Sequence, residues 1–205
     1  RIEAVDPVIN ALPIRFFDQA LAAASDAEAR YAGRGVTPRP LEGLPVAVKD
    51  EIAVEGQPAT AGSLLLEHHV ADHTAPAIQR ILDAGGIIHA RSTTPEFCCA
   101  AITDTRLWGV TRNPWNSNYS PGGSSGGSGA ALAAGMAALA TGSDLAGSIR
   151  IPASFCGVVG FKPPYGRVPQ DPPFNLDHYR HDGPMARTVA DCRLLENVMA
   201  GPHPH

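Results

Sequence analysis

A glycine- and serine-rich run over residues 120–130 leads directly into a segment of small apolar residues that extends to Ala140. Glycine lets a backbone turn tightly, and small side chains let neighbouring elements pack close to a helix. Such a run is often a flexible linker, but a linker is not followed at once by an apolar helix. No Gly-Lys-Ser/Thr follows that would indicate a phosphate-binding loop. The pattern therefore predicts a tight loop and a buried helix over 128–140, with Ser128 as its N-cap.

Helical and apolar segments alternate along the chain. Residues 18–30 are alanine-rich and helical, and residues 73–85 predict a helix with Thr74 as N-cap, Pro76 in the first turn and Gly85 at its end. Further expected elements are a buried strand pair or strand and turn over 44–54, buried strands over 87–90 and 157–161, and a turn over 182–191 that enters a final helix. Alternating strands and helices predict an α/β fold with a largely parallel sheet.

Composition restricts the kind of protein and its partners. The 205 residues are 44% hydrophobic, which suffices for one sizeable core, and the net charge is −4. This mild acidity argues against nucleic acid and anionic membranes as partners. The cysteines have no CxxC spacing, as is typical of reduced thiols: Cys98, Cys99, Cys156 and Cys192. We therefore expect a cytoplasmic protein without a nucleic-acid or membrane partner, and a homodimer is an open alternative.

Lysine is scarce, because Lys49 and Lys162 are the only two in the chain. Lys162 precedes two prolines and is expected to be structural. Lys49 lies in an apolar segment, where burial favours the neutral amine that can act as a base, and arginine cannot play that part. Strand alternation places Glu51 on the same face as Lys49 and Asp50 on the other. A carboxylate turned inward would oppose the neutral amine.

Five blocks, in this order, resemble the amidase signature family: 122–127 (GGSSGG), 147–150 (GSIR), 152–160 (PASFCGVVG), 162–163 (KP) and 183–191 (GPMARTVAD). The resemblance runs from about Leu41 to Gly201. It implies the amidase signature fold, a mixed, largely parallel central sheet flanked by helices. Members of this family are usually much longer. We therefore expect residues 1–205 to be one incomplete amidase domain, whose sheet and pocket are completed beyond His205.

The resemblance also implies a Ser-cisSer-Lys triad. Ser148 would be the nucleophile, Ser124 the proton relay on a cis peptide after Gly123, and Lys49 the base. The spacings of 75 and 24 residues are similar to those of the family. The chemistry is sound, since a serine hydroxyl needs a base within hydrogen-bond reach to become a nucleophile. It requires no cofactor and no metal.

Backbone N–H groups before the nucleophile are expected to form the oxyanion hole: those of Leu145, Ala146, Gly147 and Ser148. Many relatives have two glycines before the nucleophile, and Ala146 replaces the first of them. Alanine fits this turn only with a negative or mildly strained φ.

Four further residues are expected to support these loops. Gly123 precedes the relay serine, Ser125 is a hydrogen-bonding neighbour, and Asp144 is an acceptor for backbone N–H groups. Arg150 is interpreted as forming a structural ion pair, with binding of a substrate carboxylate as the alternative.

The histidines suggest a metal site only superficially. His68, His69 and His73 lie close in sequence, but no Cys or carboxylate stands at ligand spacing on a firm helix, and a solvated loop is the expected structure. His178 and His181 belong to an aromatic loop that could border a pocket.

The sequence thus predicts an amidase that hydrolyses a small-molecule amide to an acid and ammonia or an amine, through an acyl-enzyme on Ser148. One alternative is the glutamine-hydrolysing subunit of the tRNA-dependent amidotransferase, which uses the same machinery in a complex but differs from this chain around residues 172–181. The alternative of another class is an inactive fragment or a noncatalytic binding module with the amidase fold.

Overall fold

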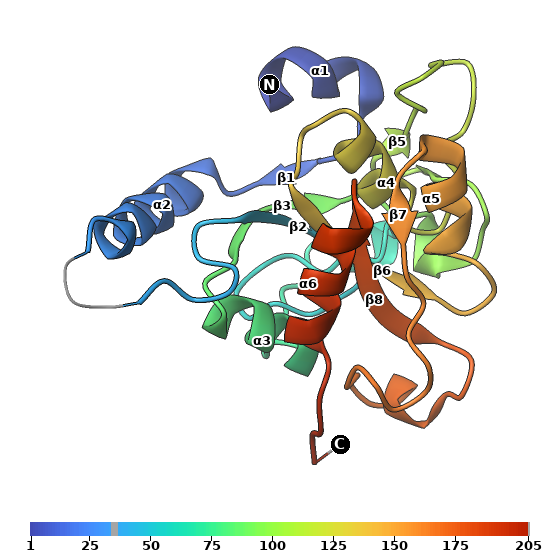
Figure 1. The fold of residues 1–205 in the computed structure, drawn as a ribbon. Helices are drawn as coiled ribbons and strands as arrows, with labels where there is room; N and C mark the ends of the chain where they lie inside the picture. Colours follow the sequence, from blue (N-terminus) through green and yellow to red (C-terminus); the bar gives the residue numbers. More distant parts are fainter. Residues whose placement is uncertain (34–36, 205) are drawn as a thin grey trace.

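The computed structural model describes residues 1–33 and 37–204, which form a six-stranded sheet with helices on both faces (Figure 1). Across the sheet the strands are β1 (Ile14–Arg15), β3 (Ile87–Ser92), β2 (Pro45–Lys49), β6 (Leu139–Asp144), β8 (His181–Ala186) and β7 (Val159–Gly160). The central strands β3, β2 and β6 are parallel, whereas β1 and β8 are antiparallel to their neighbours. β7 is antiparallel to β8 and so points the same way as β6. The predicted α/β fold with a mixed, largely parallel sheet is confirmed.

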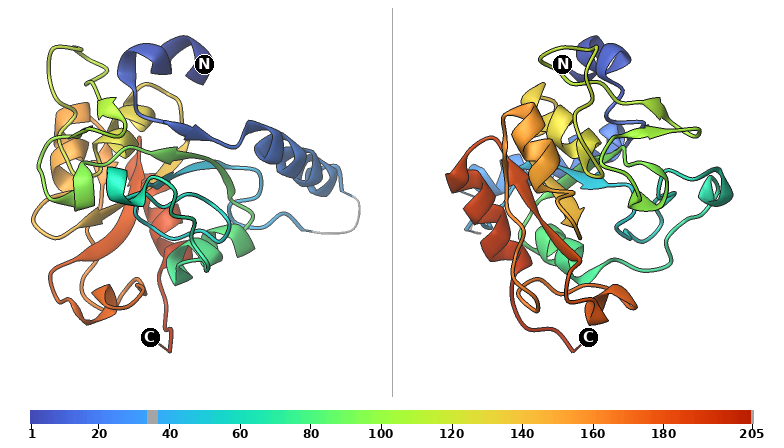
Figure 2. Two further views of the ribbon diagram at one scale, coloured as in Figure 1. Left: turned by 180° about the vertical axis from the view of Figure 1, so that it is seen from behind. Right: turned by 90° about the vertical axis from the view of Figure 1, so that its right-hand side faces the viewer.

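Helices cover both faces of the sheet (Figure 2). On one face lie α3 (Pro76–Asp83) and α6 (Val189–Met199), and on the other α4 (Gly126–Ala133) and α5 (Arg150–Cys156). The remaining elements are α1 (Ile2–Ile9), α2 (Phe17–Tyr31), which extends away from the sheet, the hairpin of β4 (Asp104–Thr105) and β5 (Gly109–Val110), and the short helices η1 (Leu64–Leu66), η2 (Glu96–Cys98) and η3 (Phe174–Leu176).

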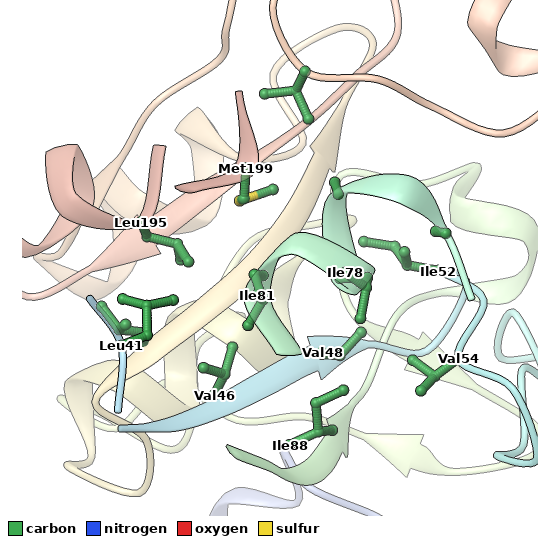
Figure 3. Packing of buried hydrophobic residues seen from close by; sticks show 14 of the residues in the cluster. Leu41, Val46, Val48, Ile52, Val54, Ile78, Ile81, Ile88, Leu195 and Met199 are labelled. Carbon is green, nitrogen blue, oxygen red and sulfur yellow. The ribbon is translucent and has the colours of Figure 1, made fainter. Parts of the chain in front are cut away.

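Side chains alternate along β2 and contribute to a core on each face. Val46 and Val48 pack in one buried cluster with Ile78 of α3 and Leu195 of α6 (Figure 3). Ala47 belongs to the cluster on the other face, with the alanines of α4. Each fully buried aliphatic side chain contributes about 1.5–3 kcal/mol, so the strand that ends in the candidate base is firmly held.

Several predicted elements are confirmed. α2 contains the helix expected over 18–30. β2 is a strand within the segment 44–54, as expected, and β3 contains the strand expected over 87–90. Pro76 opens α3 as expected, and Gly85 follows its end with a φ of +90°. Thr74 is not the cap, because its hydroxyl accepts a hydrogen bond from the Glu55 N–H instead.

The helix predicted over 128–140 is wrong in both its bounds and its cap. α4 ends at Ala133, and Leu139 begins β6, a central strand of the sheet. Gly135 turns the chain with a φ of +67°, and the small residues of β6 suit a strand that is buried on both faces. Ser128 lies inside α4, where its hydroxyl donates to the Thr141 carbonyl at 2.7 Å.

Two C-terminal predictions also need correction. The strand expected over 157–161 is a two-residue strand at the end of the sheet, β7, which is only half-buried. The turn expected over 182–191 overlaps β8 (His181–Ala186), a strand that was missed because its Gly and Pro residues suggest a loop. α6 does follow, with Thr188 as its N-cap.

The first turn of α4 needs glycine because the chain just after β3 packs closely on it. A Cβ at Gly127 would lie 2.4 Å from the Thr93 nitrogen. Gly127→Ala is expected to lower the free energy of unfolding by about 1–3 kcal/mol, measured by chemical denaturation of the complete protein. Gly129→Ala is the matched control in the same helix, because its Cβ would meet nothing nearer than Pro152 at 3.1 Å. Equal losses in the two variants would contradict this account.

Candidate active site

Lys49 is the last residue of β2, and its side chain is fully buried. Its Nζ lies 2.7 Å from Ser124 Oγ and 2.8 Å from Ser143 Oγ. β2 and β6 are parallel neighbours in the sheet (Figure 1). Lys49 and Ser143 lie near the carboxyl ends of these two strands, which brings their side chains together. The predicted base and relay residues are therefore in direct contact.

The serine- and glycine-rich loop presents Ser124 just before α4. The Gly123–Ser124 peptide bond is cis, as the family resemblance implies. A Cβ at Gly123 would lie 2.6 Å from the Ile102 carbonyl oxygen, so this position has room only for glycine. Ser124 is 1% exposed, and its hydroxyl is turned inward to Lys49.

Ser148 lies in the loop that follows β6 and is half-buried. The backbone N–H of Ser125 donates to the Ser148 carbonyl at 3.1 Å, and the Ser125 hydroxyl bonds the backbone of Ser143. Ser125 thus ties the two serine-bearing loops together. Within the part of the chain that the structure describes, the Ser148 hydroxyl forms no hydrogen bond with Ser124 or Lys49. Catalytic hydrogen bonds often tighten only when substrate binds.

Asp144 holds the loop of Ser148 from beneath. Its buried carboxylate accepts hydrogen bonds from the backbone N–H groups of Gly147, Ile149 and Arg150, and the Arg150 guanidinium donates twice to it, each at 2.9 Å. Burial works to raise the pKa of Asp144, but the Arg150 side chain and the backbone donors outweigh it and hold that pKa at about 2. Lys162 adds a contact, since its Nζ donates to the Leu145 carbonyl at 3.0 Å. Through its two hydrogen bonds to Asp144, the Arg150 guanidinium forms an ion pair with that carboxylate.

Of the four backbone N–H groups predicted as oxyanion donors, one already has an acceptor within the protein. The Gly147 N–H already donates to Asp144 at 2.7 Å. Among the described residues, the N–H groups of Leu145, Ala146 and Ser148 donate no hydrogen bond and remain available. Gly147 takes the left-handed conformation, with a φ of +123°, whereas Ala146 has no positive φ. Alanine before Gly147 therefore fits this loop.

Two polar residues at the site were not assigned a part by the sequence. Ser143 lies three residues beyond the helix predicted over 128–140, in the strand β6 that the sequence did not predict. Glu51 was placed on the face of Lys49 by strand alternation, and its carboxylate lies 3.1 Å from Nζ. Asp50 faces away, as expected, and accepts hydrogen bonds from Thr60 and Trp108.

The histidines that the structure describes belong to no group of metal ligands. His73 lies between Asp72 and Asp171, and His181 begins β8 rather than a loop. Within residues 1–33 and 37–204, no three His, Cys, Asp or Glu side chains group as ligands for a metal ion. In the same ranges, no helix has the length and apolar character needed to cross a bilayer.

Sequence comparison identifies similar proteins over the whole chain. A family model described as Amidase matches residues 1–205. A glutamyl-tRNA(Gln) amidotransferase subunit from Synechococcus sp. (strain CC9605) is 44% identical over 209 residues, a match that covers 100% of this chain and 42% of that protein. The corresponding subunit from Nitratidesulfovibrio vulgaris (strain DP4) is also 44% identical, over 98% of this chain and 41% of that protein.

Solved structures agree with these sequence matches. A 6-aminohexanoate cyclic dimer hydrolase, complexed with substrate, superposes with a TM-score of 0.90 and 38% identity over 99% of this chain and 42% of that one. A bacterial aryl acylamidase described as an amidase signature enzyme gives a TM-score of 0.91 and 34% identity over 98% of this chain and 42% of that one. The chain thus spans less than half the length of these relatives. It belongs to the amidase signature family.

Proposed function

We propose that the protein containing this chain hydrolyses a carboxylic amide through an acyl-enzyme on Ser148. The observation that carries this proposal is the buried contact of 2.7 Å between Lys49 Nζ and Ser124 Oγ, beside the loop that bears Ser148. A buried amine against a serine hydroxyl is the arrangement that proton relay from a second serine requires.

In the acylation step, Ser148 Oγ attacks the amide carbonyl while its proton passes to Ser124, whose own proton passes to Lys49. In this proposal, the N–H groups of Leu145, Ala146 and Ser148 stabilise the oxyanion. Collapse of the tetrahedral intermediate breaks the C–N bond, and the leaving nitrogen takes the proton back through the same relay. Water then attacks the ester with Lys49 again as base, which releases the acid and free Ser148.

The alternative within this family is a glutamine-hydrolysing subunit, and the 44% identity to amidotransferase subunits favours it as a second candidate. The complete protein should be assayed for ammonia release from glutamine and from simple linear amides. Turnover of simple amides by the protein alone supports a free-standing amidase. Turnover of glutamine only with partner subunits supports the amidotransferase.

We expect part of the substrate selection to come from residues outside this chain. β7 ends the sheet among the described residues, and relatives are more than twice as long. We propose that the rest of the domain completes the sheet and the substrate pocket, in the single amidase domain expected from the sequence.

Labelling with a fluorophosphonate tests the proposed nucleophile directly. The complete protein should be labelled, and Ser148→Ala should abolish labelling because no oxygen remains to attack phosphorus. Ser117→Ala, at an exposed loop serine, is the control and should be labelled like the wild type. Absence of labelling in the folded wild-type protein would favour the noncatalytic binding module.

A further inference from the structure

A carboxylate whose side chain is 11% exposed completes the surroundings of the candidate base. Glu51 Oε1 lies 3.1 Å from Lys49 Nζ and also accepts a hydrogen bond from the Ser143 hydroxyl. Ser143 Oγ is itself 2.8 Å from Nζ. The amine is therefore enclosed by the Ser124 hydroxyl, the Ser143 hydroxyl and the Glu51 carboxylate.

Arg180 lies on the far side of Glu51. Its Nη2 is 3.3 Å from Glu51 Oε2 and 3.2 Å from Asp182 Oδ1. Its Nη1 donates to Gln170 at 2.7 Å, and the guanidinium carbon lies 4.0 Å above the centre of the Phe174 ring. With its side chain 12% exposed and these contacts made, Arg180 is a fixed charge next to Glu51 rather than a free binding group for substrate.

The pKa values of Glu51 and of two ionisable groups near it are shifted from their ordinary values. Burial alone would raise the pKa of Glu51, but the Lys49 and Arg180 cations outweigh it and hold that pKa below its ordinary value. Burial raises the pKa of Asp182 to about 6 and that of the Cys98 thiol, in η2, to about 12.

Arg91 of β3 donates a hydrogen bond to the backbone carbonyl of Lys49 at 3.2 Å. The neighbouring Asp50 carboxylate is engaged by Thr60 and Trp108 on the opposite side of the strand. Among the described residues, Glu51 is thus the carboxylate in direct contact with the amine, and Arg180 contacts Glu51 from its other oxygen.

We propose that Glu51 is a positioning residue for the base and that Arg180 offsets part of its charge, so that the pair sets the pH range in which Ser148 is activated. This inference rests on the proposed function. Glu51 holds the amine between the two hydroxyls and stabilises the ammonium formed when Lys49 takes the relayed proton. Its charge also attracts the ammonium more strongly than the neutral amine, because opposite charges at this distance interact favourably. Arg180 acts in the opposite direction.

The test measures the second-order rate constant for fluorophosphonate labelling of Ser148 in the complete protein as a function of pH. The acid limb is the part of this pH profile in which the rate constant rises with pH to its plateau. In Glu51→Gln, the acid limb should move to lower pH by about 1 unit, and the plateau rate constant should fall because the ammonium is less stabilised. In Arg180→Gln, the acid limb should move to higher pH. Arg39→Gln removes an arginine from another buried carboxylate, Glu42, away from the site, and should leave the limb in place.

Opposite displacements support the inference, since a general loss of structure would lower labelling without moving the limb in two directions. Limbs that coincide with the wild type, or that move together, overturn it. Should Glu51→Gln not fold, the displacement in Arg180→Gln and its reversal in Arg180→Lys decide the question. Failure of the proposed function looks different, because wild-type labelling would then be absent or independent of Lys49.

Discussion

Lys49→Arg is expected to lower amide hydrolysis by the complete protein about 10⁴-fold, the upper end of what a general base contributes. A guanidinium stays protonated and cannot accept the proton that Ser124 relays. The same lysine serves both acylation and deacylation in the proposed mechanism, so no step escapes the loss. The measurements are kcat/KM for ammonia release and the rate of fluorophosphonate labelling.

The other lysine provides a control with the same chemical change. Lys162→Arg keeps a donor for the Leu145 carbonyl, so a loss of less than about tenfold is expected, well below the effect of removing the base. Thermal unfolding of both variants checks that the fully buried site accepts arginine. A folded Lys49→Arg protein with wild-type turnover would show that Lys49 is not the base.

The parts of the fold that could be predicted are those with a strong local pattern. The alanine-rich α2 and the apolar strands β2 and β3 are specified by their own residues. β6 and β8 are not, because their glycines, prolines and small polar residues have little strand propensity. These strands form because pairing with β2 and with each other buries them on both faces, which depends on residues far away in the chain.

The candidate site follows the same division. Motifs identify Lys49, Ser124 and Ser148, and strand alternation places Glu51 beside the lysine. Ser143 could not be found without the course of β6, since its contact with Lys49 spans 94 residues. The hydrogen bond from the Gly147 N–H to Asp144 could not be predicted from the sequence either, because each carboxylate oxygen can accept from any of several nearby donors.

The ionisation of Asp144 makes the geometry of the loop that contains Ser148 depend on pH. Its pKa of about 2 lies below the ordinary value of an aspartate, about 4, so its contribution to folding is complete above about pH 4 and is lost as pH falls toward 2. A difference of this size corresponds to about 2–3 kcal/mol. Acid should therefore weaken the fold and the nucleophile loop together over this range.

Asp144→Asn is expected to destabilise the protein at pH 7 by about 3–5 kcal/mol and to lower fluorophosphonate labelling of Ser148 at least about 100-fold. The amide nitrogen would face donors where the carboxylate oxygen accepts, leaving the buried N–H of Ile149 and the partly buried N–H of Arg150 without a partner. Arg150→Gln is the matched control, because the backbone hydrogen bonds to Asp144 remain and the lost arginine is 55% exposed. Chemical denaturation and labelling of the folded fraction separate the two effects. If the control loses as much labelling as Asp144→Asn, the ion pair rather than the backbone donors shapes the loop.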